Sequence, residues 1–259
     1  MIIQHLINEL TGPALSMPDH TVDTIKYGDA SLDVRHIGIC FTATAEVLER
    51  AGSAGVQFLI THEPLFYDHF DRIREQHPVI ERKLGLLRRL GITVWRYHDS
   101  MHRLPTDGII EGISHKLKWQ IQPIDRQIWK FETPMTALQA AEDIRVRLHC
   151  GGVRVCGNTV DPLERIAMAE GDSGVNTKYM DQLIMSGFEG MVFIGEACEW
   201  GALEQIRDAD HLGLPIAAVI IGHAASEEAG MELLSEKLRA AHPELIVDYF
   251  PTGEVYSHF

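Results

Sequence analysis

The chain is poor in cysteine and has no long hydrophobic run. Four cysteines occur among its 259 residues, none of them in a CxxC pair, namely Cys40, Cys150, Cys156 and Cys198. This scatter predicts reduced, mostly buried thiols and argues against a disulfide framework or a cysteine-based zinc site. The longest apolar run, 214–221, is far shorter than the ~20 residues of a membrane span, and the opening MIIQHLINELTG lacks the features of a signal peptide. We therefore expect a cytoplasmic protein with no membrane contact.

Basic residues are also scarce. The sequence has 23 Lys and Arg against 37 Asp and Glu, which gives a formal net charge of −14. Affinity for nucleic acid depends largely on basic side chains that contact phosphates, so this balance argues against DNA or RNA as a partner. The hydrophobic content of 45% over 259 residues is sufficient for one large or two modest cores. We find neither a low-complexity segment nor a flexible linker.

Three segments place histidine and carboxylate side chains directly after apolar runs. They are His62 and Glu63 in VQFLITHEPLFY, His98 and His102 in ITVWRYHDSMH, and His223 and Glu227 in PIAAVIIGHAASEE. Each run is typical of a buried parallel strand, and open α/β sheets bind ligands at the carboxyl ends of such strands. Two of the pairs are spaced i,i+4 and would share one face of a helix. Four imidazoles and two carboxylates suffice for two transition-metal ions, so the pattern predicts a dinuclear metal centre.

The two halves of the chain show a weak internal duplication. In the first half we expect strands at 37–41, 56–61 and 92–97, with helices at 45–51 and 79–90 between them. In the second half we expect strands at 165–169, 191–194 and 216–221, with helices at 178–185 and 202–211. One helix in each half closes with Leu-Gly, at Gly91 and Gly213, where glycine suits a left-handed C-cap. This alternation predicts an α/β fold of two related α/β/α units with mostly parallel sheets, whose strand ends would collect all the ligands in a cleft between the units.

We place the first unit at residues 1–125 and the second at 126–259, and leave open that the C-terminal segment packs back on the first. The stretch 119–160 has a pattern of its own. WQIQPIDRQIWKFE predicts an exposed strand pair, and CGGVRVCGNTV predicts a short strand with turns. Between them, Thr133 and Pro134 are expected to provide the N-cap and the first residue of a helix.

The motifs THEPLFY, EGDSG, FIGEACEW and GHAASEEAG, together with the segment 98–102, resemble the Nif-three-like dinuclear metal-centre family, also named GTP cyclohydrolase I type 2. The resemblance covers nearly the whole chain and omits only the inserted domain of longer members. It implies a Nif-three-like fold and a ring-shaped homohexamer with its sites facing an internal cavity. It also implies that two divalent metal ions per subunit are bound, with Glu227 bridging them, by His62, Glu63, His102, His223 and Glu227.

Two positions depart from the family pattern. Where the family usually has His-His-Pro, this chain has His62-Glu63-Pro64, and His102 occupies a position that is usually aspartate. The two changes exchange a histidine and a carboxylate, so the number of each ligand type and the formal charge of the site are unchanged. We interpret them as a compensated swap that preserves the site, although the metal preferred at each position can change. The donor types suit Zn, Fe, Mn, Co or Ni.

Other residues keep two interpretations. His98 is as consistent with a metal ligand as with a residue that orients the ligands by hydrogen bonds. The EGDSG segment either binds an anionic group through its backbone amides or simply forms a strand-to-helix turn. Glu196 follows a buried strand and either lines the cleft or caps a helix. His69 lies among polar residues and is expected at the surface.

Metal-assisted hydrolysis is the chemistry that such a centre favours. The substrate would be a small molecule, for example nucleotide-like or a cyclic amide; no basic cluster near the ligands is suited to a triphosphate, and family resemblance does not establish a substrate. The alternative is a non-catalytic metal protein that serves as a reservoir, a chaperone or a regulatory scaffold. An acidic or basic side chain beside the ligands, not itself bound to metal, would favour the hydrolase over the non-catalytic protein. Asp68, Asp99 and Glu196 are candidates for it by position.

Overall fold

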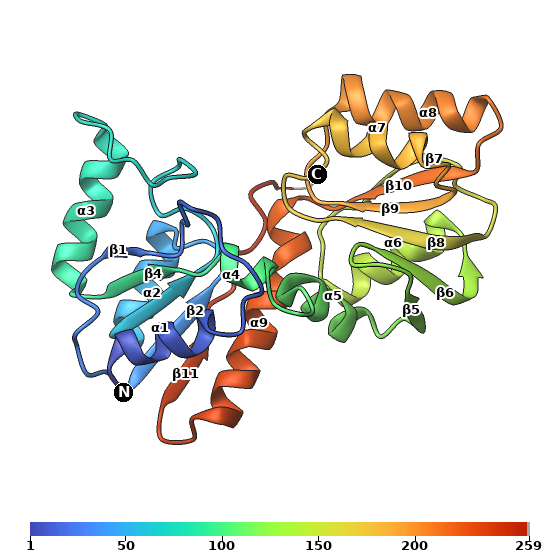
Figure 1. Ribbon diagram of the computed structural model, residues 1–259. Helices are drawn as coiled ribbons and strands as arrows, with labels where there is room; N and C mark the ends of the chain where they lie inside the picture. The colour runs from blue at the N-terminus through green and yellow to red at the C-terminus, as the bar shows by residue number, and fades with distance from the viewer. Residues whose placement is uncertain (258–259) are drawn as a thin grey trace. The chain divides into compact units, whose positions relative to one another are not determined.

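The computed structural model describes residues 1–257, which form two compact units (Figure 1). Unit 1 consists of Met1–Gly112 and Gly230–Thr252, and unit 2 consists of Ile113–Ala229 and the residues from Gly253 onward. Each unit contains one β-sheet with helices packed on it, which confirms the expected α/β class. The helices α5 (Gly108–Leu117) and α9 (His223–Ala241) each contribute residues to both units.

Unit 1 is built on a sheet with the strand order β1-β4-β3-β2-β11. Its strands are β1 (Ile25–Tyr27), β2 (His36–Cys40), β3 (Phe58–Thr61), β4 (Thr93–Arg96) and β11 (Ile246–Tyr249). Its helices are α1 (Ile3–Thr11), α2 (Ala45–Ala54), α3 (Pro78–Leu90) and the short α4 (Asp99–His102). Strands β4, β3, β2 and β11 are parallel, and only β1 pairs in the antiparallel direction. In the register of β3 and β4, Thr61 lies opposite Arg96, so the segments that follow them begin side by side.

The helices of unit 1 begin and end where the chain provides capping groups. Thr44 accepts a hydrogen bond from the backbone N–H of Val47 at the start of α2. Gly91 ends α3 with a φ of 66°, the left-handed conformation expected for it. Both helices bury apolar side chains against the sheet, in a core that includes Leu48 and Leu87. This packing holds the carboxyl ends of β3 and β4 on a rigid base.

Unit 2 is built on a sheet with the strand order β5-β6-β8-β9-β10-β7. Its strands are β5 (Ile121–Pro123), β6 (Ile128–Met135), β7 (Arg154–Gly157), β8 (Leu163–Ala169), β9 (Gly190–Ile194) and β10 (Ile216–Ile220). Its helical elements are α6 (Ala137–Arg147), α7 (Thr177–Met185), the π-helical turn η1 (Glu199–Leu203) and α8 (Glu204–His211). The strands β8, β9 and β10 form the expected parallel core, and the other strands add in the antiparallel direction. Figure 1 shows α7 and α8 on one face of this sheet and α6 on the other.

One sequence-based expectation in unit 2 is wrong. Thr133 and Pro134 do not start a helix but lie within β6, whose pairing with β8 is irregular between Lys130 and Met135. A proline is tolerated at such an irregularity because no regular ladder hydrogen bond is lost there. The N-cap is Thr136, which forms a reciprocal capping box with Gln139. The two hydrogen bonds of this box explain why the helix begins three residues later than expected.

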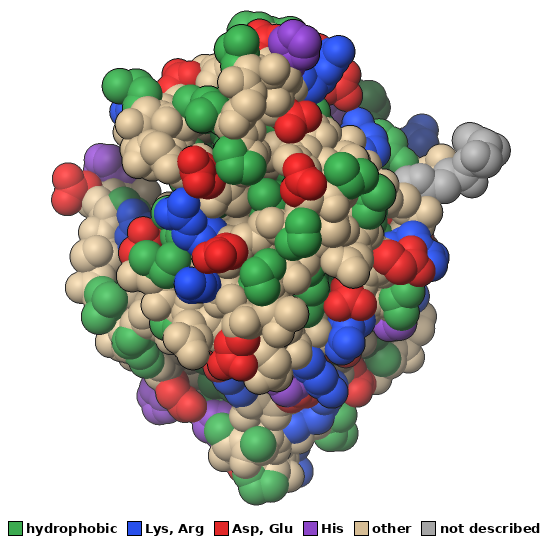
Figure 2. Space-filling view, turned by 90° about the vertical axis from the view of Figure 1, so that its right-hand side faces the viewer, with side chains coloured by type: hydrophobic (Ala, Val, Ile, Leu, Met, Phe, Trp, Pro, Cys, Tyr) green, Lys and Arg blue, Asp and Glu red, His purple; other side chains and the backbone are tan. Residues whose placement is uncertain are grey.

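The surface of the molecule carries charges of both signs. On the face shown in Figure 2, acidic and basic side chains are interspersed among hydrophobic ones instead of being gathered into a basic stripe. All four cysteines are free; Cys40 and Cys150 are buried, and Cys156 and Cys198 are half-buried. Within residues 1–257, no helix combines the length and the apolar character that crossing a membrane requires.

Candidate metal centre

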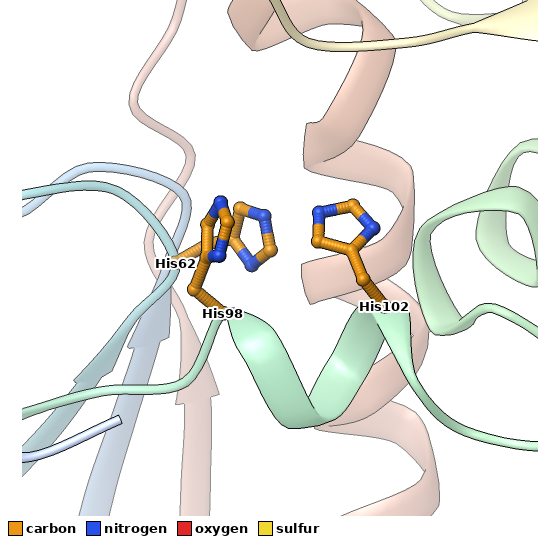
Figure 3. Close-up of side chains that lie close together, drawn as sticks. All are labelled: His62, His98 and His102. Atoms are coloured by element: carbon orange, nitrogen blue, oxygen red, sulfur yellow. The ribbon is translucent and has the colours of Figure 1, made fainter. Parts of the chain in front are cut away.

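Three histidines gather at the carboxyl ends of β3 and β4 in unit 1. His62 directly follows β3, while His98 and His102 stand at the beginning and end of α4, just after β4 (Figure 3). One ring nitrogen of each histidine lies within 4.8 Å of the corresponding nitrogens of the other two. Because β3 and β4 are adjacent, parallel and end at the same edge of the sheet, they bring together side chains that are up to 40 residues apart in the sequence.

His62 is buried, and its ring orientation is set by the backbone. Its Nδ1 lies 2.9 Å from the carbonyl oxygen of Tyr97. A carbonyl oxygen only accepts hydrogen bonds, so Nδ1 carries the proton and Nε2 presents a lone pair. Burial lowers the pKa of His62 well below its usual value, and the neighbouring His98 and His102 lower it further. The imidazole is thus held neutral, which is the form that binds metals.

His102 has a carboxylate as its orienting partner. Its Nδ1 lies 2.9 Å from Oδ2 of Asp107, whose other oxygen accepts hydrogen bonds from the backbone N–H groups of Ile109 and Ile110. Burial raises the pKa of Asp107, but the hydrogen bonds from His102 and from the backbone outweigh it, so the pKa is lowered overall. The ionised carboxylate can only accept, which again leaves Nε2 of His102 as the acceptor. Sequence reasoning missed Asp107, although an acidic residue just before a helix was the available signal.

Glu63 lies beside His98 and a buried arginine. One carboxylate oxygen is 3.7 Å from Nε2 of His98, and the other is 3.8 Å from Nη2 of Arg96. Arg96 is fully buried at the end of β4 and donates from Nε to the carbonyl oxygen of His62 at 2.9 Å. This guanidinium therefore holds the backbone of the loop that carries His62 and Glu63. Sequence reasoning also missed Arg96, whose signal was a charged residue ending an otherwise apolar strand.

In unit 2 the first turns of α9 bring His223 and Glu227 together. Nε2 of His223 lies 3.2 Å from Oε2 of Glu227, as their i,i+4 spacing predicts. Nδ1 of His223 lies 2.8 Å from Oε1 of Glu196, which comes two residues after β9. This contact assigns Glu196 a role in orienting His223. An oxygen acceptor thus faces Nδ1 in His62, His102 and His223 alike.

The EGDSG segment forms a tight strand-to-helix turn beside this pair. The N–H of Gly171 donates to the hydroxyl oxygen of Ser226, and the N–H of Ser173 donates to the carbonyl of Glu170. These amides are used within the protein, so the turn interpretation fits better than anion binding. Gly171 has a φ of +62°, and a Cβ there would collide with a carboxylate oxygen of Glu227. Glu170, which sequence reasoning did not single out, is a buried carboxylate at the end of β8.

The structure thus places the expected ligands in two groups, each within one unit. Unit 1 brings together His62, Glu63 and His102, and unit 2 brings together His223 and Glu227. Imidazole nitrogens and carboxylate oxygens suit divalent transition metals. The donor chemistry of both groups therefore fits a metal site. The set of five ligands as a whole stays a prediction.

Known proteins share this fold and sequence pattern. A solved structure of protein ybgI, of unknown function, has a TM-score of 0.80 at 21% identity and covers 99% of this chain and 100% of its own. A Bacillus cereus protein related to NIF3 has a TM-score of 0.74 at 14% identity, with 98% of each chain covered. A Clostridium perfringens protein named GTP cyclohydrolase 1 type 2 homolog is 23% identical over 82% of this chain and 80% of its own. The profile of the Duf34/NIF3 (NGG1p interacting factor 3) family matches residues 4–254. The chain belongs to the Duf34/NIF3 family.

Proposed function

We propose that the protein binds two divalent transition-metal ions per chain and uses them to hydrolyse a small substrate. The proposed ligands are His62, Glu63 and His102 of unit 1 and His223 and Glu227 of unit 2, with Glu227 bridging the ions. One observation carries the proposal. Each of the three ligand histidines has Nδ1 on an oxygen acceptor, the arrangement that is typical of metal-binding histidines, and Nε2 of His223 faces the carboxylate of Glu227, the other proposed ligand of unit 2.

Several residues of the chain would support hydrolysis at this centre. When bound, the ions would lower the pKa of a coordinated water and polarise the substrate. Asp68, Asp99 and Glu196, the acid or base candidates from the sequence, each contact a basic side chain, Arg72, His98 and His223 respectively. We assign the proton-transfer role to Glu170 for its position. It is buried and precedes Gly171, the residue packed against Glu227 and His223.

The basic residues near the unit 1 ligands constrain the substrate. Arg72 forms an ion pair with Asp68 at 2.8 Å, and buried Arg96 is bonded to the backbone of His62. These guanidinium groups are already engaged, and the chain carries a net charge of −14. We therefore favour a substrate of low negative charge, such as a cyclic amide or a nucleobase-like ring. The name of the C. perfringens relative is the ground for keeping a nucleotide-like molecule within the proposal.

Metal analysis followed by a hydrolysis screen tests the proposal. Purified chain would be stripped with a chelator, reloaded separately with Zn, Mn, Fe, Co or Ni, and analysed for bound metal by elemental analysis. We expect two equivalents per chain, reduced to one or none by His62→Ala and His223→Ala. The surface variant His5→Ala is the matched control and should retain both ions. The reloaded protein would then be screened against cyclic amides, nucleosides and nucleotides.

The outcomes separate the parts of the proposal. At most one equivalent of metal at saturation contradicts the dinuclear centre. Two equivalents without turnover of any substrate class support the non-catalytic alternative, a metal reservoir or scaffold. Turnover that disappears on chelation and in Glu170→Gln, while Glu170→Gln keeps both ions, supports the hydrolase and the role of Glu170.

A further inference from the structure

We propose that His98 is itself a metal ligand, so that unit 1 holds one ion through three imidazoles, those of His62, His98 and His102. This inference rests on the proposed metal-binding function and adds one ligand to it. The sequence left His98 equally consistent with a ligand and with an orienting residue. The arrangement of donors around the ring favours the ligand.

The three rings form a close, mutually adjacent group (Figure 3). The ring centroids of His62 and His98 are 4.6 Å apart, those of His98 and His102 are 5.0 Å apart, and those of His62 and His102 are 5.1 Å apart. Nitrogens that bind one zinc ion at ~2.0–2.1 Å each can be at most ~4.2 Å apart. The nitrogens here lie within 4.8 Å of one another, so side-chain rotations of well under 1 Å would bring them within that limit.

The ring of His98 is oriented in the same way as those of its two neighbours. Its Nδ1 lies 3.1 Å from Oδ1 of Asp99. The other oxygen of this carboxylate, Oδ2, accepts hydrogen bonds from the hydroxyl of Thr21 and the backbone N–H of Val22. Because the Asp99 carboxylate acts as the acceptor, Nδ1 of His98 carries a proton and Nε2 presents a lone pair. All three imidazoles of the group thus offer the same nitrogen.

The backbone around His98 is also anchored. Oδ1 of Asp23 accepts hydrogen bonds from the backbone N–H groups of His98 and Asp99, and its Oδ2 accepts one from Ser100, all at 2.8 Å. Asp99 is held in turn by the hydroxyl of Thr21 at 2.9 Å. Ligand side chains that are held in place before the metal binds lose little conformational freedom on binding. The segment is therefore built to hold the His98 ring in one place.

An orienting role fits the geometry less well. A histidine that orients a ligand does so by a hydrogen bond to it. The rings of His98 and His62 are stacked with an interplanar angle of 28°, which is not a hydrogen-bonding arrangement. Nε2 of His98 is 3.7 Å from the carboxylate of Glu63, which is longer than a hydrogen bond. His98 therefore orients neither His62 nor Glu63.

Three imidazoles bring no negative charge, so the carboxylates of the proposed ligand set would provide the charge that compensates the ion. In unit 1 that carboxylate is Glu63, which lies 3.7 Å from Nε2 of His98, whereas Asp99 and Asp107 face Nδ1 atoms. His98 would thus add a neutral donor to the ion without adding negative charge.

The test counts coordinated imidazoles in the full-length chain. Elemental analysis and competition titration with Zn²⁺ would be combined with X-ray absorption on the zinc-loaded protein. To isolate the unit 1 ion, the measurements use the double variant His223→Ala, Glu227→Ala. We expect this variant to hold one ion with three imidazoles. Adding His98→Ala should lower the count to two and reduce affinity by more than ~100-fold, beyond the 10–100-fold typical of losing an orienting residue.

His69→Ala, added to the same double variant, is the matched control. Its exposed ring lies 5.9 Å from that of His98, and its removal should leave the imidazole count at three. If His98→Ala does not fold, ¹⁵N-histidine labelling with ¹¹³Cd in the double variant still decides the question. Coupling of ¹¹³Cd to three Nε2 nuclei supports the inference, and coupling to two overturns it.

The result separates this inference from the proposed function. A wild-type chain that binds no metal overturns the proposed function and the role of His98 together. A wild-type chain that binds metal, with an imidazole count and affinity unaffected by His98→Ala, overturns only the role of His98.

Discussion

Single hydrogen bonds decide which nitrogen each candidate ligand offers. His62, His102 and His223 use Nδ1 on a backbone carbonyl, Asp107 and Glu196, respectively. In His62 and His102 the acceptor oxygen fixes the proton on Nδ1 and leaves the lone pair on Nε2, whereas Nε2 of His223 also faces a carboxylate, that of Glu227. Residues that contact no metal themselves would therefore control metal affinity.

Asp107→Asn tests this control. The amide oxygen of asparagine can still cap α5 by accepting from Ile109 and Ile110, but its NH₂ group would face Nδ1 of His102 and favour a proton on Nε2. We expect metal affinity, measured by competition titration, to fall 10–100-fold while the thermal midpoint changes little. Asp143→Asn is the control, because Asp143 accepts from Trp119 and touches no histidine. Unchanged affinity in Asp107→Asn would show that His102 does not bind through Nε2.

At the scale of elements, the turn between β8 and α7 shapes the unit 2 ligands. Gly171 packs against Glu227 and His223 on the first turns of α9, at a backbone conformation that favours glycine. A short turn thus fixes the position of two side chains that come more than 50 residues later in the chain.

Gly171→Ala should therefore lower metal affinity as well as stability. The left-handed backbone alone costs about 1–2 kcal/mol when alanine replaces glycine. Gly187→Ala is a matched control, since Gly187 has a φ of +71° and open space around its Cβ position. We expect comparable losses of unfolding free energy from the strained backbone in both variants, measured with urea, but a loss of metal affinity only in Gly171→Ala. Equal metal affinities would mean that the turn does not position Glu227.

Helix α3 carries a buried lysine that should make stability depend on pH. Lys83 donates from Nζ to the carbonyl oxygen of Leu65 at 2.8 Å, and burial lowers its pKa from 10.5 to about 8. Between pH 8 and 10.5 the unfolded chain keeps this proton more often than the folded chain does, so the contribution of Lys83 to stability rises with pH. Below pH 8 the buried charge destabilises the fold by up to about 3 kcal/mol.

Lys83→Met should remove this dependence. Its free energy of unfolding should exceed that of wild type most at pH 7, and the difference should shrink as the pH rises toward 10. Urea unfolding followed by circular dichroism measures both. Arg82→Met changes an exposed neighbour and is the control: its free energy of unfolding should differ from that of wild type by the same amount at every pH. A constant difference for Lys83→Met as well would mean that Lys83 is not desolvated.

At the scale of the whole molecule, we propose the homohexamer that the family resemblance implies. Unit 2 exposes large apolar side chains that association could cover, among them Trp200, which is 83% exposed. Aromatic residues are enriched in protein interfaces. Light scattering coupled to size exclusion should give a mass about six times the 29.1 kDa of one chain, and Trp200→Glu should lower it. A mass of 29.1 kDa for wild type would contradict the hexamer.

The sequence alone determined the parallel core of each unit and the residues at its strand ends. Apolar runs ending at His62, His98 and His223, and glycines such as Gly91, are local signals, because burial pattern and capping depend on neighbouring residues. The three strand-end motifs are therefore recognisable from the order of residues in the chain. The composition of the candidate ligand set rests on the family resemblance and stays a prediction.

Only the tertiary structure decided which groups orient those ligands. Strand β11 pairs with β2 about 210 residues away, Asp23 anchors the segment around His98, and Glu196 reaches His223. The N-cap of α6 is Thr136 and not Thr133, because Thr133 lies within β6 and the capping box forms between Thr136 and Gln139. These features depend on contacts between distant parts of the chain. A single hydrogen bond requires only one residue of the right type at each end, so such contacts produce no periodic pattern in the sequence.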